Sequence, residues 1–226
     1  MTTVVVLQSN YVPWRGYFDL IRRADDFVFY DTVQFTKNDW RNRNRIVTQT
    51  GPVWLTVPVA TSGQFGQTIE TVSVSDPRWP SRHLKTLQSA LGSAPCFRSQ
   101  LKPRLDDWFA AAAEMHRLSA INQYLVAQLM QLLGIATRLH DAADLPQKGD
   151  RTGRLVSICQ SLGATRYLSG PSARSYLDET QFLAAGIAVE WMAYPAYPAY
   201  RQMDGGYEAG ISILDCLAHL PHDKVF

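Results

Sequence analysis

The chain opens with a continuous, mostly β-branched run at residues 3–7, and an apolar run follows at 27–30. Between them, apolar residues recur at helical spacing over 15–24. Neither run alternates with polar residues, which is typical of strands covered on both faces in a parallel sheet packed between helices. The pattern therefore predicts a β-α-β unit at the start of the chain.

The middle of the chain changes period. Residues 54–59 and 68–75 are predicted strands joined by the polar loop 62–67. From 77 to 133, leucines and aromatic residues recur every three or four positions, which indicates helices. We expect residues 77–134 to form a helical insertion or cap of three helices.

The last third returns to alternating strands and helices. Strands are predicted at 135–139, 166–168 and 187–192. Helices are predicted at about 153–162 and 175–185, ended by Gly163 and Gly186. The two β-α-β units predict an α/β fold: a doubly wound, mostly parallel, Rossmann-like sheet in one domain, 1–226. Ligands of such sheets bind beyond the carboxyl ends of the strands. The segments after the predicted strands, 8–15, 31–38 and 169–172, should therefore converge on one crevice.

The composition, 46% hydrophobic and 11% aromatic in 226 residues, is enough for a full core. No apolar run approaches the roughly 18 residues of a membrane span, and the start lacks the pattern of a secretory signal. We expect a cytoplasmic protein that does not insert into a membrane. Three widely separated cysteines fit neither a disulfide framework nor paired metal spacing, and Pro221 interrupts the close pair His219 and His222. No metal or cofactor is expected.

Charge is concentrated in one short segment. Residues 35–46 carry four cations against the single acid Asp39, a balance of +3, whereas the whole chain is only +2. A nucleic-acid binder usually spreads its cations and reaches a pI above about 9, so we expect no DNA binding. If residues 41–46 are extended, the arginines line one face and the asparagines the other. The alternative is a solvated edge strand. Three asparagines and Trp40 favour a pocket for an anionic small molecule, since arginine matches phosphate and carboxylate geometry.

Three loops carry further candidate chemistry. Residues 8–17 are rich in amide and aromatic side chains around Pro13, which fits either a ligand loop at a helix start or an ordinary turn. Residues 168–173 fit either an anion cradle of small residues or a tight strand-to-helix turn. The repeat Tyr194–Tyr200 could be a stacking lid, with Tyr197 over a ligand, or a crossing packed into the core. No local nucleophile motif is present.

Residues 8–45, together with 167–171 and 189–192, closely resemble the WbqC-like protein family over essentially the full chain. Members are encoded among bacterial surface-polysaccharide clusters (O-antigen of lipopolysaccharide, capsule) and some natural-product clusters, which implies a cytoplasmic biosynthetic step on an amino sugar or amino acid. Residues 7–35 more faintly resemble pantothenate synthetase and the nucleotidylyltransferases. Trp14, Arg15 and Tyr17 stand where those enzymes carry phosphate-stabilising histidines, which argues against ordinary adenylation.

The resulting hypothesis is a transferase that forms an amide by moving an acyl or aminoacyl group, such as glycyl, onto an amine of a nucleotide-linked sugar. The donor would be an acyl carrier, a carrier protein or aminoacyl-tRNA. Asp31 is the candidate general base and Lys37 a second candidate catalytic residue. Alternatives are a non-catalytic sugar-nucleotide-binding accessory protein and an ATP-dependent amide ligase. The candidate substrate-binding residues are Gln8, Asn10, Tyr11, Trp14, Arg15, Tyr17, Asn38, Trp40, Arg41, Asn42, Arg43, Asn44, Ser169, Gly170, Ser172 and Tyr197.

Overall fold

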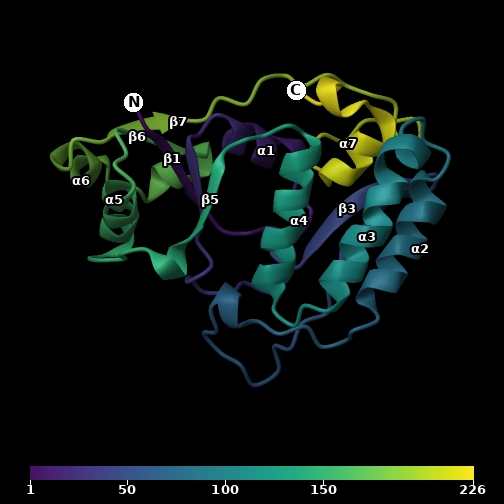
Figure 1. The fold of residues 1–226 in the computed structure, drawn as a ribbon, viewed down its shortest axis with the longest axis horizontal. Coiled ribbons are helices and arrows are strands. Elements are labelled where there is room, and N and C mark those ends of the chain that lie inside the picture. The colour runs from purple at the N-terminus through teal and green to yellow at the C-terminus, as the bar shows by residue number, and fades with distance from the viewer. The chain divides into compact units, whose positions relative to one another are not determined.

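Five parallel strands form a sheet in the computed structural model, which describes residues 1–226 (Figure 1). They lie in the order β5-β2-β1-β6-β7. The chain therefore adds β2 and β5 on one side of β1, and then adds β6 and β7 on the other side. This confirms the predicted α/β fold with a doubly wound, Rossmann-like sheet. The strands are β1 (Thr3–Leu7), β2 (Asp26–Phe29), β5 (Arg138–Asp141), β6 (Arg166–Ser169) and β7 (Ala188–Trp191).

The chain divides into two units, which we name after their contents. The sheet unit comprises Met1–Gln8, Gly16–Val33 and Ile135–Pro195. The helical unit comprises Ser9–Arg15, Gln34–Gly134 and Ala196–Phe226. Each unit is assembled from three separate stretches of sequence, and each is described below by itself.

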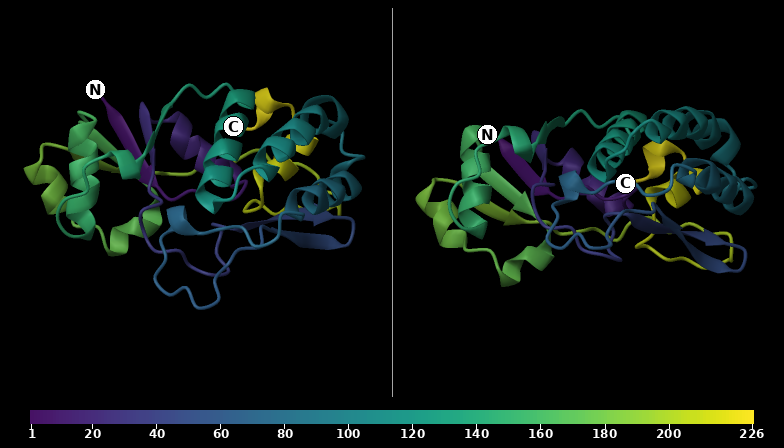
Figure 2. Two further views of the ribbon diagram at one scale, coloured as in Figure 1. Left: turned by 60° about the horizontal axis from the view of Figure 1, so that its bottom comes forward. Right: turned by 90° about the horizontal axis from the view of Figure 1, so that it is seen from below.

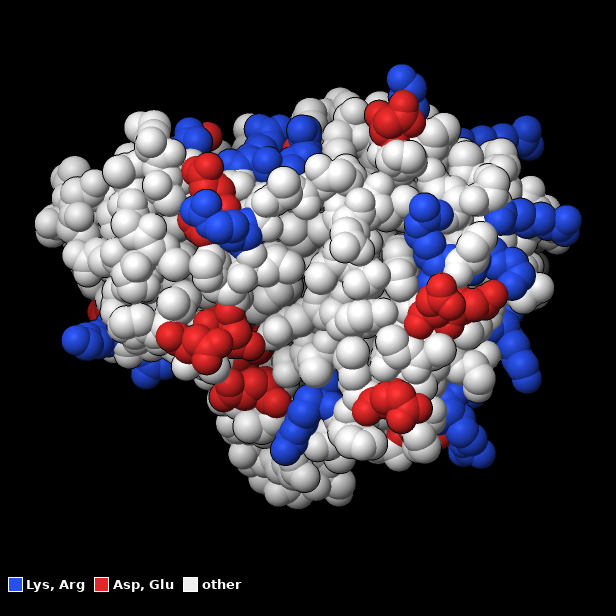
Figure 3. Space-filling model, viewed as in Figure 1, with Lys and Arg blue, Asp and Glu red and all other residues white.

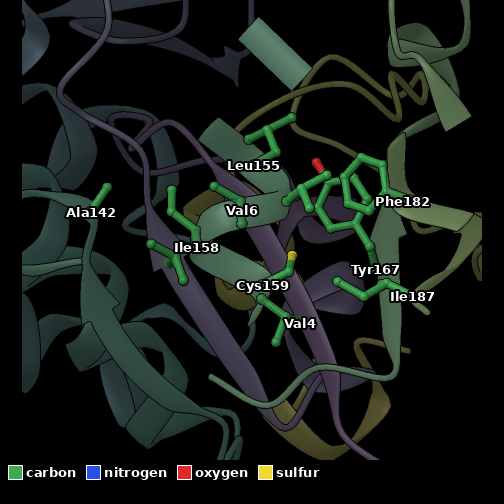
Figure 4. Close-up of a cluster of buried hydrophobic side chains, with 11 residues drawn as sticks. Val4, Val6, Ala142, Leu155, Ile158, Cys159, Tyr167, Phe182 and Ile187 are labelled. Atoms are coloured by element: carbon green, nitrogen blue, oxygen red, sulfur yellow. The ribbon is translucent and has the colours of Figure 1, made fainter. Parts of the chain in front are cut away.

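Helix α5 (Arg151–Ser161) covers the core of the sheet unit together with α6 (Glu179–Ala184). Figure 4 shows side chains of β1, α5 and β6 meeting in this core, which also includes Phe182 and Ile187. The rings of Tyr167 and Phe182 stack with their centroids 4.7 Å apart. Asp150 caps α5 by accepting a hydrogen bond from the Gly153 amide at 2.7 Å. Helix α1 (Arg15–Arg22) joins β1 to β2.

The helical unit contains three longer helices, a short buried helix and a hairpin. The helices are α2 (Trp79–Leu91), α3 (Lys102–Ala113), α4 (Leu118–Leu132) and α7 (Ile213–His219), and the antiparallel hairpin is β3 (Arg43–Thr48) with β4 (Gly51–Thr56). Helix α7, yellow in Figure 2, contacts both β3 and the π-helical turn Phe97–Leu101. Residues 77–134 thus hold α2, α3 and α4. No helix of the structure is both long and apolar enough to cross a membrane.

Several predicted elements differ from the structure. The strand expected at 68–75 is wrong: it contains a 3-10 turn, Ile69–Thr71, and only isolated bridges. Ile69 and Val72 are both buried, and their spacing of three residues suits this turn. The helix expected at 175–185 begins only at Glu179, after the cap Asp178, because a separate 3-10 turn occupies Pro171–Ser175. Further 3-10 turns lie at Ala142–Asp144 and His222–Lys224.

Candidate functional site

The carboxyl edge of the sheet brings together predicted residues of the sheet unit. β1 and β6 are neighbours, and the connections that leave them run in opposite directions, which makes this point a topological switch. Gln8 follows β1 directly, and Ser169 ends β6. Asp31 lies two residues after β2, which pairs with β1 on its other side, and its side chain is fully buried. Tyr17 donates a hydrogen bond to the Gln8 carbonyl at 3.1 Å.

The loop after β6 has the predicted small-residue form only in part. Gly170 and Pro171 lead into the short 3-10 turn rather than a long helix, and Ser172 is exposed. A Cβ added to Gly170 would lie 3.8 Å from the Tyr194 hydroxyl, which is ordinary contact. Ser169 itself is buried. Among the predicted residues of this edge, Asp31 is therefore the one that carries a buried carboxyl group.

The basic segment, residues 37–45, belongs to the helical unit, and its side chains alternate as predicted. Asn42 and Asn44 are buried, whereas Arg43 and Arg45 are half-buried on the other face. Asn42 donates to the Val57 carbonyl at 3.0 Å. Asn44 donates to the carbonyls of Tyr11 and Val12 at 3.2 and 3.0 Å. The side-chain amides of these two asparagines are therefore used in hydrogen bonds to backbone carbonyls, and the arginines face outward.

The arginines of the segment differ in their partners. Arg45 forms an ion pair with Glu208, which comes from a remote part of the sequence. Arg41 hydrogen-bonds to Asn10 and lies 3.8 Å from the Asp39 carboxylate. Burial disfavours the Asp39 carboxylate, but its hydrogen bond from Thr36 and the nearby arginines outweigh this and lower its pKa. Glu208 thus reduces the local charge of +3, in which Asp39 is already counted.

Arg43 forms hydrogen bonds only to a neutral residue, although it also interacts electrostatically with the Asp39 carboxylate. Its guanidinium donates to Asn38 and lies 4.2 Å from the centre of the Trp54 ring. Lys37 is exposed and forms no ion pair. Elsewhere, positive and negative side chains are interspersed in small groups over the face shown in Figure 3. No broad basic face is seen on this side of the molecule.

A cavity of about 240 Å³ lies beside the basic segment within the helical unit. Two indoles line it, from Trp14 and Trp40, and the Trp40 ring lies 5.7 Å from that of Trp54. The other lining residues are Asn10, Pro13, Asn44 and Gly210. Asn10 and Trp14, from one loop, thus share this cavity with two candidate binding residues of the basic segment, Trp40 and Asn44.

Tyr11 and Arg15 lie inside the helical unit. The Tyr11 hydroxyl is 2.7 Å from His83 Nδ1, and burial raises the pKa of Tyr11 well above its usual value. Arg15 is only 2% exposed and donates to the Pro198 carbonyl at 2.9 Å and to the Tyr207 hydroxyl. The Tyr197 ring lies 4.8 Å from the Arg15 guanidinium. Tyr197, itself only partly buried, therefore packs on a buried cation, and its role over a ligand stays a prediction.

The predicted site residues thus form two sets. Gln8, Tyr17, Asp31, Ser169, Gly170 and Ser172 belong to the sheet unit, and the remaining candidates belong to the helical unit. Their convergence on one crevice stays a prediction. Sequence reasoning missed Glu208 and Gly210, because residues 201–212 carry no recognisable motif. It also missed Trp54, for which the pattern predicts only the start of a strand.

Comparison with known proteins gives a family and a relative. The profile of the WbqC-like protein family matches residues 8–225. The protein named "Uncharacterized protein Rv1507c" of Mycobacterium tuberculosis is 44% identical over 220 residues, which covers 96% of this chain and 93% of that protein. No solved structure matches the chain. The match includes the basic segment and the loops that follow β1, β2 and β6.

Proposed function

The chain belongs to the WbqC-like protein family, and we propose that it is a biosynthetic transferase that forms an amide bond. It moves an acyl or aminoacyl group, such as glycyl, from an activated carrier onto an amine of a nucleotide-linked sugar or related molecule. The setting is bacterial surface-polysaccharide or natural-product biosynthesis, in the cytoplasm. Asp31 and Lys37 keep the catalytic roles that the sequence predicts for them, and substrate binding falls to the candidate residues whose side chains are not already bonded to backbone in the interior.

One observation carries the proposal: a fully buried carboxylate, Asp31, stands at the carboxyl edge of a doubly wound sheet. The carboxyl edge is where such sheets bind ligands, so a carboxylate held there is placed to meet a substrate. The polar residue Gln8 follows the neighbouring strand. We therefore assign Asp31 the role of general base.

The reaction needs positioning and a base more than a covalent intermediate. The acceptor amine attacks the carbonyl carbon of the carrier-bound acyl group, and a C–N bond forms as the C–S or C–O bond to the carrier breaks. Asp31 accepts the proton lost by the amine, and the carrier leaves as a thiol or alcohol after taking up a proton. Arg41 and Arg43 bind the phosphate of the nucleotide-linked acceptor.

A ligand screen followed by a turnover assay tests this function. Ligand binding raises the melting temperature by an amount that grows with the ratio of ligand concentration to Kd. Nucleotide sugars, ATP and acyl carriers can therefore be ranked by affinity before donors and acceptors are paired in the turnover assay. Asp31→Asn is expected to abolish amide formation and keep the ligand-induced melting shift. Asp144→Asn, at an exposed site of the same unit, serves as the control. Full activity of Asp31→Asn would overturn the role of Asp31, and ATP cleavage to AMP or ADP would favour a ligase.

A specific observation also favours the non-catalytic alternative, a sugar-nucleotide-binding accessory protein. No acid, base or nucleophile lines the cavity of the helical unit, whose polar side chains are amides and indoles. Such a lining suits binding alone. If the chain binds nucleotide sugars but no donor supports turnover, the accessory function is the correct one.

A further inference from the structure

Two large aromatic side chains are exposed next to the cavity of the helical unit. Trp40 is 39% exposed and Trp54 is 46% exposed, and their rings lie 5.7 Å apart. Arg43 stacks on Trp54 at 4.2 Å, so a guanidinium lies next to this pair of indoles. Exposed aromatic clusters with a neighbouring cation are a feature of ligand-binding surfaces.

The groups left without protein partners around this cavity are donors. Asn10 uses its Oδ1 to accept from Arg41, and its Nδ2 makes no hydrogen bond within the protein. The indole N–H of Trp40 likewise has no protein partner, and Arg43 interacts electrostatically with Asp39 but forms no ion pair. The Asn44 Oδ1 already accepts from the Arg45 amide at 2.8 Å. A ligand that fits must therefore bring acceptors and negative charge.

The size of the cavity and the donors around it favour one kind of ligand ring over another. The volume of about 240 Å³ lies below the roughly 300–1,000 Å³ of pockets that enclose a whole drug-sized ligand, so the cavity suits one ring system with the rest of the molecule outside. A pyranose carries several hydroxyl donors that need acceptors, and few acceptors are open here. A nucleobase with carbonyl acceptors, such as uracil, presents both a flat face for the indoles and acceptors for the amide and N–H donors.

We propose that this cavity is a nucleotide subsite, in which a base stacks on Trp40 and Trp14 and the first phosphate binds Arg43. The inference rests on the proposed function, because it names which part of the nucleotide-linked acceptor this segment recognises. Arg45 is excluded from the phosphate contact by its ion pair with Glu208. Stacking supplies affinity for the base, and the guanidinium supplies affinity for phosphate.

Calorimetric titration of the full chain tests the subsite with uridine, UDP, N-acetylglucosamine and inorganic phosphate as separate ligands. We expect UDP to bind most tightly. Trp40→Ala should weaken both uridine and UDP by about tenfold, from the loss of one stacking surface. Arg43→Ala should weaken UDP by about tenfold and leave uridine nearly unchanged, because a charge-assisted contact to phosphate is lost. Trp40→Phe should restore most of the binding.

The controls separate this inference from the proposed function. Arg104→Ala removes an exposed arginine of α3 far along the chain and should leave every Kd unchanged, and melting curves confirm that each variant is folded. Sugar binding as tight as UDP binding, or UDP binding unaffected by both Trp40→Ala and Arg43→Ala, would overturn the subsite. Asp31→Asn tests the transferase separately, since it should change turnover and leave the UDP Kd as it is.

Discussion

At the scale of single residues, Asn44 fixes the loop that precedes Trp14. Its amide is 2% exposed and bonds to the Tyr11 and Val12 carbonyls. Val12 has a φ of 36°, which is unfavourable for a β-branched residue. The loop conformation therefore depends on contacts that hold it, and Asn44 supplies two of them from β3.

We expect Asn44→Ala to destabilise the chain by about 1–3 kcal/mol, because two buried carbonyls and the Arg45 amide lose their partner. Urea denaturation measures the change. Gln49→Ala, at an exposed position just after β3, should stay within about 0.5 kcal/mol of the parent. Equal stability of the two variants would show that the loop does not need Asn44.

His83 should make stability depend on pH. It is 6% exposed, and burial lowers its pKa from 6.5 to about 4. Its Nδ1 faces the Tyr11 hydroxyl and its Nε2 lies 3.1 Å from the Thr56 carbonyl, an arrangement that fits the neutral ring. As the pH falls, the His83 ring is protonated in the unfolded chain before it is protonated in the folded chain. The neutral ring therefore contributes fully to the free energy of unfolding above about pH 6.5, and this contribution is lost as the pH falls toward 4.

The loss should approach about 1.4 kcal/mol for each pH unit within that window. Other groups also titrate there, so the test compares unfolding free energies of the parent and His83→Gln between pH 7 and pH 4. The parent should lose more stability than the variant over this range. Parallel pH profiles would mean that His83 is protonated equally in both states.

Prediction at the level of residues succeeded where the alternation of side chains along a strand alone decides which face each residue occupies. The faces of Asn42 to Arg45 follow from the period of a strand, and the structure has them as predicted. Pairing across long sequence separations was beyond this reasoning: Glu208 neutralises Arg45, and nothing near either residue indicates it. The isolated charge of the basic segment was therefore overestimated.

At the scale of elements, α7 is tied to the hairpin by one buried carboxylate. Asp215 accepts from the Val47 amide at 2.8 Å and from the Tyr200 hydroxyl at 3.1 Å. Burial raises the pKa of Asp215. No sequence pattern predicts α7, because it has seven residues and nearly all are buried, so no polar face marks a helical period.

Asp215→Ala should release α7 from β3, because two buried donors lose their acceptor. We expect a loss of about 1–3 kcal/mol and faster hydrogen exchange at Val47 and across Ile213–His219. Asp215→Asn keeps an acceptor oxygen and should lose less. Unchanged exchange at these amides in Asp215→Ala would contradict the role of this contact.

At the scale of the whole molecule, the sheet was predictable and the division into units was not. Continuous apolar runs and glycine-ended helices define β1, β2, β6 and β7 locally. The two units instead depend on contacts between stretches of sequence that lie far apart, such as 9–15 with 196–226 in the helical unit. Period and composition carry no information about which stretches meet.

The interleaved sequence of the units predicts that neither half of the chain folds alone. The core of the sheet unit joins Val4, Val6 and Val28 to the side chains of α5 and β6, and β1 is the central strand. A fragment of residues 135–226 lacks β1 and β2, so it leaves β5 without its partner strand and exposes the apolar face of α5. It should therefore lack cooperative thermal unfolding by circular dichroism. Co-expression with residues 1–134 should restore a cooperative transition, because the missing strands then complete the sheet. A fragment 135–226 that melts cooperatively by itself would show that the contributions of β1 and β2 are dispensable.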